Sequence, residues 1–321
     1  MLVKKSILLG LFAAAVFTFA AAGPTFAYIN ENIELDQETG FSLSPMRLQT
    51  DIMPGVVSEG KFRVRSTGRR DQNMFAEIVP FSVTGSNYDS PDYANFTQRS
   101  EIIRWITISL EGCDATAKEA GRVYFSMRPQ EECYIQYKID VPANAPAGSQ
   151  HAALFVQDVV DDSMGGTGVI KSHRIGAVLY ASNRKGDIEE QGKILKQDIP
   201  FWVFSGPLNT GALIENSGNI DFNAEIEIEV QNLFGQKVYT SEHPSKYIVL
   251  AETTRYITEN WDHSGVGIFK VKQTVRMLGE AHAIEKWSFL IPMWLLIIML
   301  IAFVVVIIAL IYGRKNNKKG R

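Results

Sequence analysis

An uncharged apolar run near the C-terminus constrains this chain more than any other feature. No charged residue occurs from Trp287 to Gly313. As a helix, residues 291–312 would extend about 33 Å, enough to cross a hydrocarbon core of about 30 Å. Trp287, Trp294 and Tyr312 lie toward its ends, where amphipathic rings prefer the membrane interface. We therefore predict a single transmembrane helix over residues 287–312, with these three residues as interface anchors in the lipid bilayer.

The residues after this run indicate its orientation. The tail, residues 313–321, carries five basic residues and no acidic one. Positive charge next to a membrane span marks the cytoplasmic side. We therefore expect a single-pass protein of the cell membrane, with its N-terminal ectodomain outside and a short basic tail in the cytoplasm.

The N-terminus has the pattern of a secretory signal. Lys4 and Lys5 precede an apolar stretch over residues 7–22, and small residues follow it. This pattern predicts a signal peptide over residues 1–27 with cleavage after Ala27. Cleavage after Ala22 is a second candidate, and a retained signal anchor is the alternative.

The charge of the predicted ectodomain limits its partners. The whole chain has 32 basic and 35 acidic residues; the signal holds two of the basic residues, the tail holds five, and neither holds an acid. The ectodomain therefore has 25 basic and 35 acidic residues, a net charge of −10. An acidic surface is a poor electrostatic partner for nucleic acid or anionic polymers. We expect no nucleic-acid partner, and any polymer should be bound by shape, stacking and hydrogen bonds.

Between these ends the sequence has the periodicity of β-strands. In NAEIEIEVQ, residues 223–231, apolar and acidic side chains alternate, and CYIQYKIDV, residues 133–141, alternates in the same way. Many short alternating runs separated by turn residues favour antiparallel sandwiches. About 260 external residues suit two such units, so we predict one over residues 38–185 and a second over 193–286. The Pro- and Gly-containing segment 141–155 is predicted to be a corner between strands.

Two cysteines, Cys113 and Cys133, lie in the predicted ectodomain. In an oxidising compartment a disulfide between them is expected, and two free thiols are the alternative. By loop-closure arguments such a bridge would contribute about 3 kcal/mol.

Residue patterns for chemistry are scarce. The five histidines fit no spaced metal motif and are predicted to be surface or turn residues, and no GxSxG elbow occurs. We therefore predict no catalytic residue, no cofactor and no metal ligand. Tyr88 and Tyr93 lie in the polar segment SNYDSPDYANF and are weak candidates for stacking on glycan rings. Coverage of a sandwich edge by these two rings is the favoured alternative.

Several segments in order resemble a known family. FSLSPMRLQTDIMPG, KFRVRST, RSEIIRWITISL, YKIDVPANAPAGSQHAALFVQ and RIGAVLYASNRKG are similar to the first extracellular domain of the WxL-interacting proteins, surface proteins of Gram-positive bacteria. ALIENSGNIDFNAEIEIEVQNLFGQKVY resembles the immunoglobulin-like domain that follows it. The resemblance implies a peptidoglycan-binding first domain and a host- or partner-binding second domain.

Taken together, these features predict an all-β protein of two tandem immunoglobulin-like sandwiches followed by one transmembrane helix. Our main hypothesis is a non-enzymatic binding or scaffolding protein that presents both domains to cell-wall glycan, meaning peptidoglycan, or to other surface proteins. The alternative is an extracytoplasmic assembly factor that acts by strand complementation, which an unpaired edge strand beside a shallow apolar groove would favour. A wall-active hydrolase is a third hypothesis, which a pocket pairing two buried carboxylates would favour.

Overall fold

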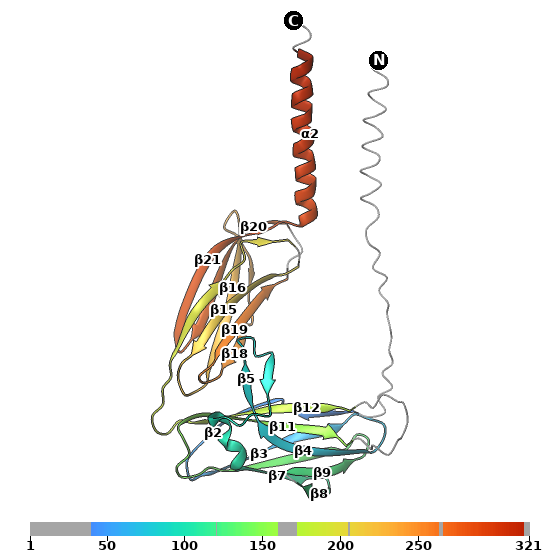
Figure 1. The fold of residues 1–321 in the computed structure, drawn as a ribbon, viewed down its shortest axis with the longest axis vertical. Helices are drawn as coiled ribbons and strands as arrows, with labels where there is room; N and C mark the ends of the chain where they lie inside the picture. The colour runs from blue at the N-terminus through green and yellow to red at the C-terminus, as the bar shows by residue number, and fades with distance from the viewer. Residues whose placement is uncertain (1–39, 120, 160–171, 205, 263–265, 318–321) are drawn as a thin grey trace. The chain divides into compact units, whose positions relative to one another are not determined.

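The structure, a computed structural model, describes residues 40–119, 121–159, 172–204, 206–262 and 266–317. The predicted signal peptide and the cleavage site after Ala27 lie outside these residues. The described chain is all-β, with two immunoglobulin-like sandwiches followed by one apolar helix, as the sequence predicts (Figure 1).

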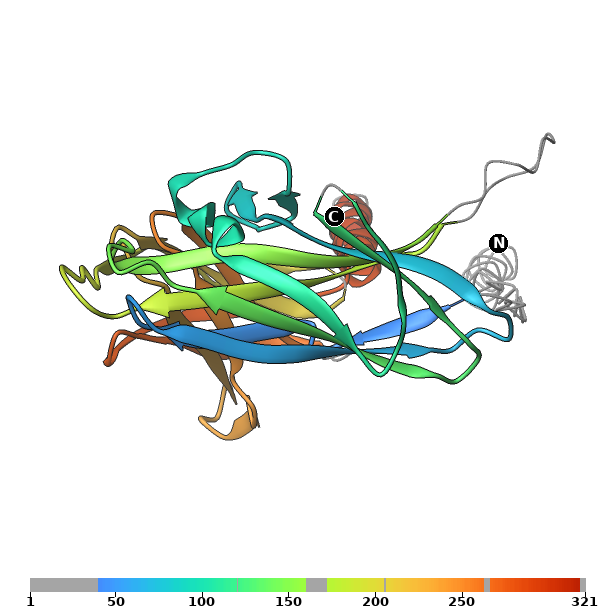
Figure 2. The ribbon, with the colours of Figure 1, turned by 90° about the horizontal axis from the view of Figure 1, so that it is seen from below.

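Two packed sheets form the first sandwich. One has the strand order β1–β3–β10–β7, formed by Phe41–Ser44, Val57–Ser66, Glu132–Asp140 and Ile106–Glu111. The other has the order β2–β12–β11–β4–β9–β8, formed by Arg47–Ile52, Arg174–Asn183, Gly148–Asp158, Gln72–Pro80, Arg122–Met127 and Ala115–Glu119. Figure 2 separates the two layers, with the blue strand β3 below the yellow-green strands β11 and β12.

Smaller elements complete the first sandwich. A short hairpin joins β5 (Ser82–Thr84) to β6 (Ser90–Asp92), and the 3₁₀ helix η1 (Gln98–Arg104) leads directly into β7. One continuous core lies between the two sheets, with Phe62, Phe125 and Leu154 among its fully buried side chains.

The second sandwich also has two sheets. One has the order β13–β15–β19, formed by Gly192–Asp198, Leu208–Asn216 and Thr254–Trp261. The other has the order β14–β21–β20–β16–β17, formed by Trp202–Val203, Glu280–Leu290, Gly267–Met277, Phe222–Asn232 and Lys237–Thr240, and β18 (Ser245–Val249) also pairs with β16.

Alternation in the sequence explains the individual strands. The apolar residues of NAEIEIEVQ are buried in β16, while Glu225, Glu227 and Glu229 are only partly covered. Strand β10 has the same pattern, with Cys133, Ile135, Tyr137 and Ile139 buried. Because successive side chains of a strand point to opposite faces, β10 and β16 each bury one face in their sandwich.

The apolar helix α2 extends from Met293 to Asn317 and follows β21 directly (Figure 1). Among the described residues it is the one helix that is long and apolar enough to cross a membrane, with residues Met293–Leu310 meeting that test. Its start is later than we predicted from the sequence. Trp287 lies in β21, because the alternating strand continues to Leu290 before the helix begins.

Candidate functional site

Strand β7 is a free edge of the first sandwich. Its one neighbour is β10, and the Asp140 N–H donates to the Trp105 carbonyl at 2.9 Å just ahead of β7. Since hydrogen-bonded pairs alternate along an antiparallel ladder, the odd-numbered residues of β7 bond to β10. The N–H and C=O groups of Ile106, Ile108 and Leu110 then point away from β10. In the part of the chain that the structure describes, no strand pairs with that side.

An apolar groove of about 460 Å³ lies between this edge and the facing sheet. Its apolar lining comes from both sheets and from η1, with Ile78, Ile103, Ile106, Ile108 and Val123. The rest of the lining is formed by Thr107, Gly121 and the charged residues Lys118, Glu119 and Arg122. The groove is therefore the open side of the sandwich, between β7 and the β8–β9 hairpin.

A second depression, of about 660 Å³, touches the same strand. It is lined mainly by polar groups, among them Lys61, Ser109, Glu111 and Gln136. The Gln136 amide donates to Glu111 at 2.8 Å, and the Lys61 ammonium lies 4.5 Å from the centre of the Tyr134 ring. Thr107 and Ile108 line both depressions, so β7 has an apolar groove along one side and a polar surface along the other.

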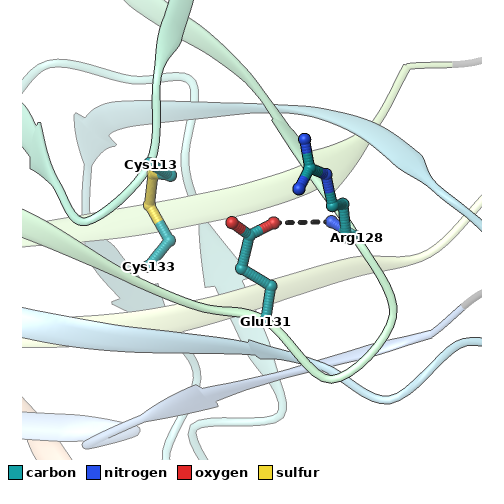
Figure 3. Close-up of a disulfide and its surroundings, with 4 residues drawn as sticks. All are labelled: Cys113, Arg128, Glu131 and Cys133. Carbon is teal, nitrogen blue, oxygen red and sulfur yellow. Dashed lines mark hydrogen bonds between the residues drawn. A yellow bond between two sulfur atoms is a disulfide. The ribbon is translucent and has the colours of Figure 1, made fainter.

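Both ends of β7 are fixed. At its start, η1 buries Ile102 completely in the core, and the Trp105 N–H donates to the Ile102 carbonyl at 2.9 Å. Just after its end, Cys113 forms a disulfide with Cys133 of β10, as the sequence predicts (Figure 3). In the turn before β10, the Arg128 N–H donates to the Glu131 carboxylate at 2.7 Å (Figure 3). An edge strand that is held at both ends has little conformational freedom left to lose when another strand pairs with it.

The two sandwiches meet at a polar seam. The His151 ring nitrogen Nε2 lies 2.8 Å from the Asp221 carboxylate, and both side chains are buried. The other oxygen of Asp221 accepts the Ala251 N–H at 2.8 Å. The Asp221 N–H donates to the Ser149 hydroxyl at 2.9 Å, and Gly148 packs so closely that a Cβ there would lie 2.2 Å from the Asn219 carbonyl oxygen.

This seam corrects one prediction and extends another. The sequence predicts His151 to be a surface or turn residue, whereas its side chain is buried, because Asp221 of the other sandwich supplies its polar partner. The corner predicted over residues 141–155 does connect β10 to β11. Its last part also docks against the second sandwich through Gly148 and Ser149. The contacts of His151 and Ser149 with Asp221 could not be identified from the sequence, since they join residues some 70 positions apart.

Tyr88, a candidate glycan-binding residue, contributes to the same seam. Its hydroxyl accepts the Leu250 N–H at 3.0 Å and contacts the Thr253 hydroxyl at 2.5 Å. The Arg255 guanidinium lies 4.4 Å from the centre of its ring. Burial raises the pKa of the Tyr88 phenol, and burial also lowers the pKa of Arg255.

Tyr93, the other candidate, lies against the first sandwich. Its ring meets Phe155 edge-on with centroids 4.7 Å apart and also contacts Phe81 at 5.8 Å. Burial raises the pKa of its phenol. The structure therefore does not bring the two tyrosines to β7, and glycan binding by either ring stays a prediction.

The buried acidic side chains Glu259 and Asp221 have different hydrogen-bond partners. Glu259 of β19 accepts the Ser241 hydroxyl at 3.3 Å, while Asp221 bonds to His151 and Ala251 in the seam. Within the described residues, no group of three or more His, Cys, Asp or Glu side chains is placed to hold a metal ion. The arrangement at β7 offers instead unpaired backbone donors and acceptors beside an apolar groove.

No family model matches the chain, and no curated protein sequence matches it. Solved structures with a similar fold include the E. coli chaperone DraB, 11% identical, with 77% of this chain and 98% of that chain covered and a TM-score of 0.37. The CsuC–CsuE chaperone–tip adhesion subunit pre-assembly complex from Csu pili of Acinetobacter baumannii is 12% identical, with 77% and 97% covered and a TM-score of 0.37. The class 5 fimbriae chaperone CfaA is 10% identical, with 78% and 99% covered and a TM-score of 0.37. At such low TM-scores these similarities carry no argument about what this chain does.

Proposed function

We propose that this protein is a non-enzymatic, membrane-anchored protein of the cell surface that captures an extended segment of a protein partner on the free edge of β7. The observation that carries the proposal is the unpaired edge of β7 beside an apolar groove. An exposed edge strand is a template for pairing with another chain, and natural proteins use it for peptide recognition.

The two depressions indicate what kind of segment would fit. A strand added beside β7 would hydrogen-bond to Ile106, Ile108 and Leu110, and its side chains would alternate between the two faces of the sheet. One set would enter the apolar groove beside Ile78 and Ile103, and the other would lie along the polar side of β7. The partner segment should therefore alternate apolar and polar residues.

Membrane anchoring is part of the proposal. The apolar helix α2 follows the second sandwich after only two connecting residues, Ile291 and Pro292. In this arrangement α2 spans the bilayer, the basic tail lies in the cytoplasm, and both sandwiches lie outside the cell. The captured segment would then be held at the outer surface of the membrane, as an assembly or scaffolding role requires.

Selection of peptides tests the strand-capture proposal directly. The full chain in phospholipid nanodiscs is used to select decapeptides from a random library, and affinity is then measured by titration. We expect enrichment of alternating sequences and weaker binding to the Ile78→Ser variant, which removes part of the apolar groove.

The matched control is Ile175→Ser. Ile175 is also partly buried against the same core, but it lies on β12 and outside the groove lining. Its substitution should leave peptide affinity unchanged. Equal losses in the two variants, or enrichment of peptides without alternation, would contradict capture at β7.

A second candidate function is binding of peptidoglycan, which the resemblance to the WxL-interacting proteins implies. The polar depression near Lys61, Glu111 and Gln136 supports it, because hydroxyl-rich sugars are recognised by such hydrogen-bonding groups. Co-sedimentation of the full chain in nanodiscs with purified peptidoglycan tests this function. Loss of sedimentation in Gln136→Ala, with peptide binding retained, would favour glycan binding there, and no sedimentation of the unmodified chain would exclude it.

A further inference from the structure

One end of the second sandwich lies next to α2, because the chain passes there from β21 into the helix. Strand β21 ends at Leu290, and α2 begins at Met293. Strand β14 pairs with the last residues of β21, with Trp202 opposite Phe289. The pairing of Asn232 with Phe269, and of Phe269 with Ser288, places the turn between β16 and β17 at the same end. We call this the helix end.

Exposed aromatic residues flank β14 at the helix end. Phe201 is 62% exposed and Phe204 is 43% exposed. The Phe201 carbonyl accepts the Phe289 N–H at 2.8 Å, and the Val203 carbonyl accepts the Ile291 N–H at 3.0 Å. These bonds hold the segment within a few residues of the start of α2. No charged residue occurs from residue 199 to residue 208.

The turn between β16 and β17 exposes two more large apolar side chains. Leu233 is 58% exposed, and Phe234 is 87% exposed. Side-chain hydrogen bonds hold this turn together, because the Asn232 side-chain oxygen accepts the N–H groups of Phe234 and Gln236 at 3.0 Å each. The turn is thus built to present Phe234 outward without the cover of other side chains.

The opposite end of the second sandwich has a different surface. Its connections, residues 217–221, 250–253 and 278–279, include the residues that bond to the first sandwich. None of the described residues in these three connections is an exposed large hydrophobic. Exposed aromatic turns are therefore confined to the end from which α2 leaves, which a random scatter of surface apolar residues would not produce.

We propose that the Phe201–Phe204 segment and the Leu233–Phe234 turn insert into the headgroup region of the same bilayer that α2 spans. The second sandwich then rests directly on the membrane. Lipid is the expected partner of these turns because their side chains lie at the level where the chain enters α2. Aromatic rings on uncharged turns also favour the membrane interface. This inference rests on the proposed membrane anchoring and adds a second point of contact to it.

Fluorine NMR tests the insertion. The full chain carries 4-fluorophenylalanine in place of Phe234 or Phe204, at one chain per nanodisc of phosphatidylcholine and phosphatidylglycerol. Lipids with a nitroxide near the headgroup should broaden both signals, while a water-soluble gadolinium chelate should affect them little. The control is 4-fluorophenylalanine at Phe96, which is 42% exposed on the first sandwich and so matches Phe204. It should respond to the chelate and not to the lipid nitroxide.

The outcomes separate this inference from the membrane anchoring on which it rests. If the nitroxide leaves Phe234 and Phe204 as sharp as Phe96, the turns stand clear of the bilayer and the inference is wrong. Extraction of the chain with alkaline carbonate tests α2 alone. Resistance to extraction without broadening would support the membrane anchor and contradict insertion of the turns. Extraction of the chain would contradict both. One chain per nanodisc excludes a second copy as the source of shielding from the chelate.

Discussion

Replacement of Asp221 by alanine should uncouple the seam between the two sandwiches. The carboxylate has two partners, the His151 ring and the Ala251 N–H, each at 2.8 Å. Asp221→Ala removes both acceptors at once. The bond from the residue-221 N–H to Ser149 remains, because it uses the backbone.

The expected cost follows from these contacts. A buried donor left without a partner costs about 1–3 kcal/mol, and Asp221→Ala leaves two of them, the His151 nitrogen and the Ala251 N–H. Two such donors together lead to a loss of about 4 kcal/mol in the free energy of unfolding.

Urea unfolding of the full chain in detergent micelles, followed by circular dichroism, measures this loss. Asp51→Ala is the control, because the Asp51 side chain is 78% exposed and its substitution should change stability by no more than about 0.5 kcal/mol. In the double variant Asp221→Ala/His151→Ala, the cost should fall well below the sum of the two single costs. A loss below about 1 kcal/mol in Asp221→Ala, or full additivity in the double variant, would refute the account of the seam.

Two further variants test the Tyr88 contact in the seam and the disulfide of the first sandwich. Tyr88→Phe removes the acceptor of the Leu250 N–H and should cost about 1–2 kcal/mol at neutral pH, measured by urea unfolding. Burial raises the pKa of the Tyr88 phenol in the folded protein, so its contribution is complete below the unfolded pKa of about 10 and is lost as pH rises through the folded pKa. The difference between Tyr88→Phe and the unmodified chain should therefore shrink above about pH 10, and a constant difference would contradict this role. Cys113→Ala/Cys133→Ala should lower the free energy of unfolding by about 3 kcal/mol, from the 20-residue separation, and equal stability of the oxidised unmodified chain and the double variant would show that the bridge constrains nothing.

The all-β class and the apolar helix could be predicted because both depend on local patterns. Strands with one buried face, such as β10 and β16, alternate apolar and polar residues along the chain. A long uncharged run predicts a helix without any knowledge of its neighbours. The start of α2 was predicted too early, because the residues Trp287–Leu290 extend the apolar run while β-pairing with β20 makes them strand.

The candidate site could not be predicted, because it depends on the order of strands within a sheet. RWITISL predicts a strand, but nothing in these residues shows that β7 lies at an edge of its sheet. The sequence also does not show that the N–H and C=O groups of Ile106, Ile108 and Leu110 point away from β10. The seam has the same limitation. His151 resembles any polar residue in a strand until Asp221 is brought to it from the other sandwich.

The hydrogen exchange of individual backbone amides in β7 tests the central claim most directly. The full chain in nanodiscs is compared with and without a saturating amount of the selected alternating decapeptide. Strand capture predicts that the Ile108 and Leu110 amides exchange rapidly in the free protein and become protected in the complex. Thr107 and Ser109, already bonded to β10, should be slow in both states. Protection that develops elsewhere while Ile108 and Leu110 continue to exchange rapidly would contradict capture on this edge.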